Sequence, residues 1–408
     1  MKSLLNTTAV ILALVMLGMA FPVRAQDEVL ALKGCRLIDG TDRPPLNDAV
    51  IVIRGSRFLA VGPRSEVEIP SGAKLIEVDG KTVVPGLIDA HFHMCYPNTR
   101  EQPFVLNESV ASFRAAYHLR RHLLSGITTV LDAGAYRSVG IMAKQAFREG
   151  LLLGSRPVVV AERINATGGH GVSRFPMAHE ADGADGFRQA VRLQIKNGAD
   201  VIKILPPYTR AELAAAMEEA HALRRTVAVH SGYLGNYDYI RWAVELGADT
   251  IMHAYALPDD VIRMMGEKGI RGVPTMTAMM KLHAGRGRPI PEDQPHPYEV
   301  IFQKMKEAGV RMAVGTDAIY EVMKENPILY FEEVERFVKN GFTPHQAIIA
   351  ATRNGAEVLD AAERLGTVEA GKTADLLVLE ADPLEDIRHL RQVRIIIQAG
   401  KVIKDGIR

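Results

Sequence analysis

The middle of the chain repeats one pattern, in which an amphipathic, helix-like stretch ends in glycine and a short β-rich run follows at once. Glycine adopts the left-handed conformation at little cost, so it is typical of a helix end. Strands that alternate with helices predict parallel pairing through βαβ units. The pattern recurs at Gly126, Gly198, Gly247, Gly269 and Gly309. It predicts an α/β protein built around a parallel sheet.

The β-rich runs of this region supply eight candidate strands. They are Leu87–His93, Thr128–Ala133, Pro157–Ala161, Val201–Leu205, Val227–Ser231, Thr250–Ala254, Gly272–Thr275 and Met312–Thr316. Eight βα units fit a closed (β/α)8 barrel of the TIM type. An open doubly wound sheet is the rival, but no glycine-rich nucleotide fingerprint follows the first strand. We predict the barrel over residues 85–365.

The flanks of this region lack long helical patterns. "DAVIVIRGSRFLAVG" consists of two apolar runs joined at Arg54–Ser56, which predicts a β-hairpin. The C-terminal "ADLLVLEADPLEDIRHLRQVRIIIQAGKVIKDG" again alternates strand and turn patterns. We therefore expect residues 26–84 and 366–408 to form one small β-sandwich domain from both ends of the chain.

Residues 1–25 have the pattern of a secretory signal peptide. Lys2 precedes an apolar run from Ala9 to Phe21, and "VRA" ends at Ala25. The run is short for a membrane span. We predict cleavage before Gln26 and export to the periplasm or the extracellular space, with no stable membrane anchor afterwards. An uncleaved anchor is the alternative.

Composition excludes some classes of partner. The formal net charge of the 408 residues is +1, so nothing predicts a general attraction to nucleic acid. We expect a small-molecule substrate, and homo-oligomerisation stays open. An exported protein can pair its cysteines, but Cys35 and Cys95 fall in different predicted domains, and we expect two free thiols.

The stretch "GLIDAHFHM" places His91 and His93 two residues apart in a predicted strand. Residues i and i+2 of a strand project from the same face, so the two imidazoles lie side by side. Two interpretations are open: a shared metal ion, or two half-buried histidines that bond to the backbone.

Four further polar residues fall in or at the ends of other predicted strands: Lys203 in "VIKIL", His230 in "VAVH", His253 in "IMHA" and Asp317 in "VGTDA". Each has an ordinary alternative, since a lysine can extend to solvent, a histidine can be a satisfied core residue and an aspartate can cap a helix. The C-terminal strand ends of a barrel converge on one mouth. One shared site is therefore favoured over independent accidents, and nitrogen and carboxylate ligands suit zinc.

In this order, "PGLIDAHFH", "IKI", "VH", "MHA" and "GTDA", with the tail "LGTVEAGKTADLLVLEADPLEDI", resemble the amidohydrolase superfamily. Within this superfamily the sequence is most similar to the imidazolonepropionase-like group, which includes Xaa-Pro and Xaa-Arg dipeptidases. The resemblance implies a metal-dependent hydrolase with two divalent ions, expected to be Zn²⁺. It assigns His91, His93 and Asp317 to one metal and His230 and His253 to the other, with carboxylated Lys203 bridging both.

The implied reaction is attack of a metal-bridging hydroxide on an amide carbonyl, with Asp317 as general base and then acid. His170, in "ATGGHGV", resembles a substrate contact of the dipeptidase branch. Tyr233 is a second candidate substrate contact. It lies three positions after His230, whereas the branch often has a tyrosine two positions after this histidine.

The segment Met276–Tyr298 is predicted to be a loop over the mouth. Its Arg286 and Arg288 either bind a substrate carboxylate or are solvated.

The function predicted from these features is hydrolysis of C–N bonds by an exported binuclear enzyme, acting on dipeptides or N-acyl amino acids. A cyclic-amide hydrolase or deaminase on the same scaffold is the second hypothesis. Deaminase members typically use one metal and lack the lysine in the fourth strand, so Lys203 argues against that class. A catalytically inactive metal-binding protein is the third hypothesis.

Overall fold

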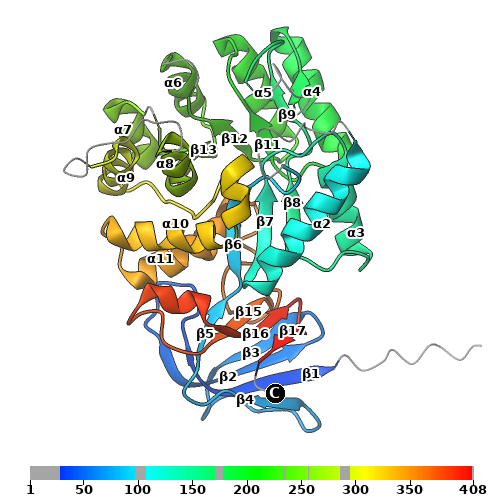
Figure 1. The fold of residues 1–408 in the computed structure, drawn as a ribbon, viewed down its shortest axis with the longest axis vertical. Coiled ribbons are helices and arrows are strands. Elements are labelled where there is room, and N and C mark those ends of the chain that lie inside the picture. The colour runs from blue at the N-terminus through cyan, green and yellow to red at the C-terminus, as the bar shows by residue number, and fades with distance from the viewer. Residues whose placement is uncertain are drawn as a thin grey trace, which may run out of the picture.

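The structure is a computed structural model that describes residues 28–96, 107–170, 178–232, 236–255, 257–284 and 295–406. In Figure 1 a barrel with surrounding helices lies above a separate sheet to which both ends of the chain contribute. The predicted fold class, a (β/α)8 barrel with a β-rich unit from both chain ends, is confirmed.

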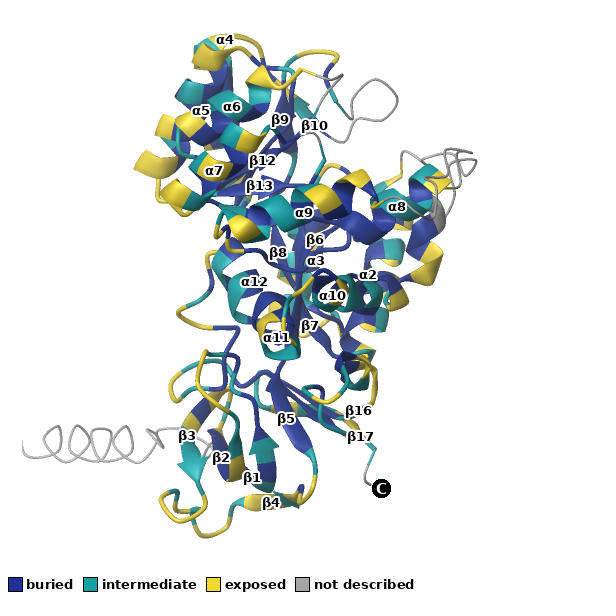
Figure 2. Ribbon diagram, turned by 90° about the vertical axis from the view of Figure 1, so that its left-hand side faces the viewer, coloured by how far each residue is buried: buried dark blue, intermediate teal, exposed yellow. Residues whose placement is uncertain are grey.

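The barrel wall consists of parallel strands whose side chains are almost all buried, as expected for strands covered on both faces (Figure 2). In chain order the strands are β6 (Leu87–Phe92), β7 (Ile127–Asp132), β8 (Arg156–Val159), β9 (Arg163–Asn165), β11 (Ile202–Ile204), β12 (Val227–His230), β13 (Thr250–Met252) and β14 (Arg271–Val273), and β10 (Ala178–Glu180) pairs with β9 outside the ring. Ile88, Leu131, Val201, Met252 and Val273 belong to one buried apolar cluster that fills the barrel.

The ring closes through an irregular segment. The predicted eighth strand, Met312–Thr316, is not a regular strand, and only an isolated bridge pairs Met312 with Gly272. Ala90 N nevertheless donates to Val314 O at 2.9 Å, and Thr316 N donates to His91 O at 3.1 Å. These bonds fasten the segment to β6, and they set the backbone just before Asp317.

Helices cover the outside of the barrel (Figure 1). They are α2 (Glu108–Leu124), α3 (Val139–Arg148), α4 (Gly183–Asn197), α5 (Arg210–Ala222), α6 (Asp238–Glu245), α7 (Asp259–Lys268), α8 (Met276–Ala284), α9 (Pro297–Glu307), α10 (Ile328–Lys339), α11 (Pro344–Ala351) and α12 (Arg353–Val358), with 3-10 turns η1 (Tyr320–Glu325) and η2 (Ile387–Arg391). A capping box formed by Thr209 and Glu212 begins α5. None of the described helices combines the length and apolar character that a membrane crossing demands.

The prediction of a loop over Met276–Tyr298 is wrong at both ends. Met276–Ala284 forms α8, and α9 begins at Pro297. Glu333 of α10 explains the first of these helices, because its carboxylate accepts from Met276 N at 2.9 Å and from Thr277 N at 2.7 Å. This contact satisfies donors that a helix N-terminus leaves open. Arg286 and Arg288 lie outside the described residues.

The chain ends form one eight-stranded sheet of β1 (Val29–Leu37), β2 (Leu46–Arg54), β3 (Arg57–Pro63), β4 (Lys74–Glu77), β5 (Thr82–Pro85), β15 (Leu376–Leu379), β16 (Val393–Gln398) and β17 (Lys401–Asp405). Strand β5 joins the two ends, since it pairs with β1 on one side and with β15 on the other. The Arg156 side chain of the barrel donates to Asp375 at 2.5 and 3.2 Å, which anchors the barrel to this sheet.

Candidate metal centre

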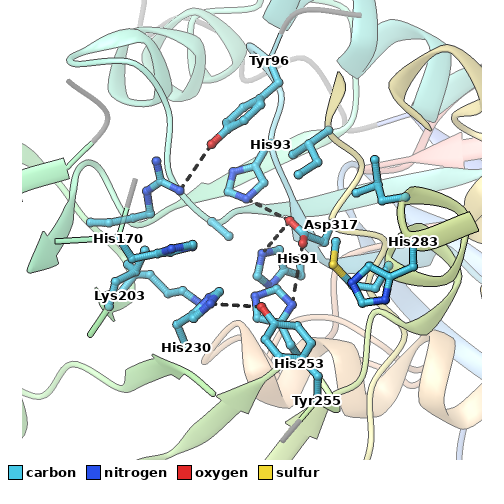
Figure 3. A pocket seen from close by; sticks show the side chains of 16 residues that line it. His91, His93, Tyr96, His170, Lys203, His230, His253, Tyr255, His283 and Asp317 are labelled. Atoms are coloured by element: carbon cyan, nitrogen blue, oxygen red, sulfur yellow. Dashed lines mark hydrogen bonds and ion pairs between the residues drawn. The ribbon is translucent and has the colours of Figure 1, made fainter. Parts of the chain in front are cut away.

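The six predicted metal ligands all line one cavity of about 280 Å³ at the barrel mouth: His91, His93, Lys203, His230, His253 and Asp317. The histidines and Lys203 come from a strand or from the residue that follows one, and Asp317 follows the irregular segment Met312–Thr316 that closes the ring. Their convergence follows from parallel βα topology, which brings the C-terminal ends of all strands to one face. Figure 3 shows these side chains directed toward one another.

Asp317 lies at the centre of a cluster of imidazoles. Its Oδ1 is 3.4 Å from His91 Nε2 and 3.2 Å from His93 Nε2, and its Oδ2 is 3.7 Å from His253 Nδ1. The ligand atoms of His91, His253 and Asp317 all lie within 4.8 Å of one another, close enough to share a cation. The structure thus groups His253 with Asp317 and His91, and not with His230 alone.

Neighbouring groups orient two of these imidazoles. His93 Nδ1 lies 3.1 Å from Gly134 O, and His253 Nδ1 lies 2.7 Å from Thr275 Oγ1. A carbonyl can only accept, so Nδ1 of His93 carries the proton and Nε2 presents a lone pair. His253 and Asp317 adopt left-handed backbone conformations, with φ of 77° and 47°. Such conformations are uncommon for residues that carry a side chain, and the surrounding structure has to hold them.

The other side of the cluster contains His230 and His170. The His230 ring centroid is 4.5 Å from that of His253 and 4.5 Å from that of His170. Tyr255 Oη lies 3.0 Å from His230 Nε2. His170, which was predicted as a substrate contact, lines this cavity, whereas Tyr233 lies outside the described residues.

Lys203 is the least ordinary member of the set. It is only 2% exposed, and its Nζ has no hydrogen-bond partner among the described residues. Burial lowers the pKa of Lys203 well below its usual value, although the charge of Asp317 opposes this effect. A structural lysine that extends to solvent is therefore excluded for this position.

Burial also keeps the histidines neutral. It lowers the pKa of His91 to about 3, and it lowers the pKa values of His93, His230 and His253 as well. Burial would raise the pKa of Asp317, but its interactions with the imidazoles of His253, His91 and His93 hold it well below its usual range. Neutral imidazoles and an ionised carboxylate are the forms that bind metal ions.

Sequence reasoning missed four residues that line the same cavity: Tyr96, Arg163, Tyr255 and His283. Tyr96 and Tyr255 follow His93 and His253 by three and two positions, and Arg163 begins β9. Tyr96 and Tyr255 lie just beyond strand ends, as the predicted ligands do, but the sequence prediction considered only metal-ligating residue types. His283 lies on α8, in the segment predicted to be a loop.

Comparison with known proteins agrees with this geometry. The sequence model of the Amidohydrolase family matches residues 82–404, which is most of the chain. This protein belongs to the amidohydrolase family. Its membership establishes a hydrolase that acts on C–N bonds with the help of metal, and the family prediction from the sequence motifs is confirmed.

Individual relatives cover nearly the whole chain. Ochratoxinase from Aspergillus niger is 27% identical over 90% of this chain and 85% of its own length. Imidazolonepropionase from Geobacillus sp. (strain WCH70) is 24% identical over 88% of this chain and 92% of its own. The crystal structure of a Xaa-Pro dipeptidase with bound methionine in the active site is 26% identical, covers 92% of this chain and 100% of its own, and superposes with a TM-score of 0.82.

Proposed function

We propose that this amidohydrolase cleaves the amide bond of dipeptides or N-acyl amino acids at a binuclear metal centre, with zinc as the expected metal. One observation carries the proposal: Lys203 Nζ is buried without a hydrogen-bond partner in the described chain, among four histidines and an aspartate. A mononuclear site of histidines and Asp317 gives no reason for an amine at this position.

A carbamate accounts for the buried amine. Carbamate formation requires a neutral amine, and burial favours that form of Lys203 by lowering its pKa. The amine nitrogen adds to the carbon of CO₂ and loses a proton, which leaves an anion with two oxygens. Such a group can bind one cation with each oxygen, so Lys203 would hold two metals together.

The remaining donors also fit divalent cations. With Nδ1 of His93 bonded to Gly134 O, the lone pair of Nε2 faces the ionised Asp317 oxygen at 3.2 Å. Two electron-rich atoms repel at that distance unless a cation lies near both. His91, His93 and Asp317 would hold one metal, His230 and His253 the other, and carboxylated Lys203 both. The two sets of ligands lie close together, since the ligand atom of His253 is within 4.8 Å of those of His91 and Asp317.

Bound metals of this kind supply a water nucleophile at neutral pH and polarise a carbonyl. The residues of the chain do the rest. The low pKa of Asp317 keeps its carboxylate ionised, so it can accept the proton of the attacking water and pass it to the leaving amine. His170 adjoins His230 and would orient the substrate. The Tyr255 hydroxyl contacts the His230 ring, so this side chain limits the space beside His230.

The substrate class rests on the named relatives. One is called ochratoxinase and another is a Xaa-Pro dipeptidase with methionine in its active site. A screen of dipeptides and N-acyl amino acids with zinc-loaded protein tests the proposal. We expect turnover that prolonged chelation abolishes and zinc restores. Fully active protein with about one metal equivalent would contradict the binuclear centre.

A cyclic-amide hydrolase is the second candidate, because imidazolonepropionases also match most of the chain. The same screen should include cyclic amides and aminated heterocycles. Turnover of a cyclic amide would identify a cyclic-amide hydrolase, and ammonia release from a heterocycle would identify a deaminase. Absence of turnover on every substrate, with metal bound, would favour an inactive metal-binding protein.

We also propose export, from the signal-like residues 1–25. N-terminal sequencing of protein recovered outside the cytoplasm should begin at Gln26. Recovery of protein with Met1 intact would contradict cleavage.

A further inference from the structure

Tyr255 contacts both histidines that are predicted to hold the second metal. Its hydroxyl oxygen lies 3.0 Å from His230 Nε2, and its ring stacks on that of His253 with centroids 4.9 Å apart and planes inclined by 19°. Figure 3 shows the three side chains together, with the hydroxyl contact as a dashed line. His230 ends β12 and His253 follows β13, so one tyrosine touches predicted ligands from two strands.

The segments that follow these two strands hold the tyrosine in place. The backbone oxygen of Tyr255 accepts from Ser231 Oγ at 3.2 Å, and Ser231 comes directly after His230. A Cβ atom at Gly232 would lie 3.1 Å from Cδ2 and Cε2 of the Tyr255 ring, which is closer than ordinary van der Waals contact. The segment after β12 therefore passes directly against the ring, and the positions of Tyr255 and His230 are coupled.

The hydroxyl contact decides which nitrogen of His230 is left for a cation. A neutral imidazole, the form that binds metal ions, has one N–H and one lone pair. The Tyr255 oxygen occupies the position beside Nε2, so the nitrogen left for a cation is Nδ1. Nδ1 has a lone pair only when Nε2 carries the proton, and a phenol oxygen can accept the resulting hydrogen bond. Tyr255 as acceptor thus selects a tautomer that binds metal.

His93 of the first predicted ligand set shows the same arrangement with the two nitrogens exchanged. Its Nδ1 lies 3.1 Å from Gly134 O, which leaves the lone pair on Nε2. In both ligand sets an oxygen of the protein thus occupies one nitrogen of a histidine and leaves the other for a cation. An oxygen partner of this kind typically fixes the orientation and the tautomer of a metal-bound imidazole.

We propose that Tyr255 is a positioning residue of the second metal, because its hydroxyl accepts from His230 Nε2 and so makes Nδ1 the atom of His230 that binds the cation. Its ring against His253 helps to keep the two ligands together, and their ring centroids lie 4.5 Å apart. The inference rests on the proposed binuclear centre, since it concerns the metal that His230 and His253 would hold.

Calorimetric zinc titration of the metal-free protein, in buffer that contains bicarbonate, tests this role. We expect two binding events in the wild type, and His230→Ala identifies the event of the second metal because it removes that event. Tyr255→Phe keeps the ring but lacks the hydroxyl, so it should raise the Kd of the same event by ~10–100-fold and leave the other event unchanged. In a His230→Ala background, Tyr255→Phe should have no further effect, because the hydroxyl acts through His230.

Tyr208→Phe provides the matched control. Tyr208 is buried, and its hydroxyl donates to Tyr239 O at 3.1 Å, so this variant also loses one hydrogen bond of a tyrosine. Both zinc affinities should remain at their wild-type values. A general loss of stability would affect both variants, whereas a role at the metal affects Tyr255→Phe alone.

Three results would overturn the inference while two metals are bound by the wild type. The first is unchanged zinc affinity in Tyr255→Phe. The second is tighter zinc binding in this variant, because the hydroxyl would then compete with the cation for Nε2. The third is an effect of Tyr255→Phe that persists in the His230→Ala background. A wild type that binds only one zinc would instead contradict the proposed binuclear centre, and this inference with it.

Discussion

Asp89 and Thr316 join the two barrel segments that carry the predicted ligands of the first metal. Thr316 donates to Asp89 twice, from its backbone N at 3.0 Å and from Oγ1 at 2.7 Å. Asp89 Oδ1 also accepts from His91 N at 3.2 Å. Both residues are buried, and each lies within two positions of a predicted ligand. The pair thereby sets the spacing between His91 and Asp317.

Thr316→Val should weaken metal retention. The substitution keeps the shape of the side chain but removes the 2.7 Å hydrogen bond to buried Asp89 Oδ2, for which His122 Nε2 at 3.6 Å is too distant to substitute, and this loss costs about 2 kcal/mol of unfolding free energy. Groups that support metal ligands typically contribute ~10-fold or more to affinity. Zinc titration of the metal-free variant measures the effect. Thr128→Val is the control, since this buried threonine of β7 makes only a 3.4 Å contact with Leu87 O. Equal zinc affinities for the two variants would contradict the role of the pair.

His170→Ala should weaken substrate use while metal content stays unchanged. The ring lies against His230 and lines the cavity, but the ligand set does not need it. We expect kcat/KM to fall by ~10-fold or more, with unchanged metal equivalents. His221→Ala, which removes a half-exposed ring paired with Asp249, serves as the matched control. Loss of one metal equivalent in the His170 variant would make it a ligand and would alter the assignment of the second metal.

The two thiols should be inert in the folded protein. Cys35 and Cys95 are both free and buried, and burial raises the pKa of each to about 12. The thiolate is the reactive form, and almost none is present at pH 8. A colourimetric thiol reagent should therefore detect both cysteines only after denaturation. Rapid labelling of the native protein, or no labelling of the unreduced denatured protein, would contradict this prediction.

Asp132 should make stability depend on pH. Its carboxyl ends β7, and burial raises its pKa from 3.8 to about 7, although the Met94 N–H and Arg163 oppose this. The folded state therefore favours the protonated form, and the stabilisation is complete below about pH 4 and is lost as the pH rises through about 7. Asp132→Asn should flatten this part of the profile. The melting temperature of both proteins between pH 5 and 8 tests the effect, and parallel profiles would contradict it.

The main features of fold and site were predictable because they follow from local rules. The period of two in a strand placed His91 beside His93, and parallel topology placed Lys203, His230 and His253 at the same mouth. Asp317 was found in the same way, although the preceding segment is not a regular strand. In each case the position along the chain alone determined where the side chain lies.

What the sequence did not reveal depends on contacts between distant residues. The helix at Met276–Ala284 begins where Glu333, more than fifty positions away, satisfies its first amides. Arg163 reaches the cavity because Gly134 leaves space for its shaft. Neither relationship has a signature in the local pattern, so the loop over Met276–Tyr298 was mispredicted and the arginine was overlooked.

A related experiment on Lys203 examines the carbamate itself. Lys203→Ala should lose most activity, because no anion remains to bind both cations. Short carboxylic acids at high concentration can occupy the space of the missing carbamate and should restore part of the activity and of the metal content. Absence of rescue, with one metal lost, would restrict the role of Lys203 to a single ion.

The most direct test of the account is the number of metal equivalents bound by Lys203→Arg beside the wild type. Arginine preserves a long cationic side chain, but a guanidinium does not form the carbamate. We expect about two equivalents in active wild-type protein and about one or fewer in the variant, with turnover largely lost. A variant that retains about two metals and near-normal turnover would show that Lys203 acts as a structural cation, and the bridged binuclear centre would be wrong.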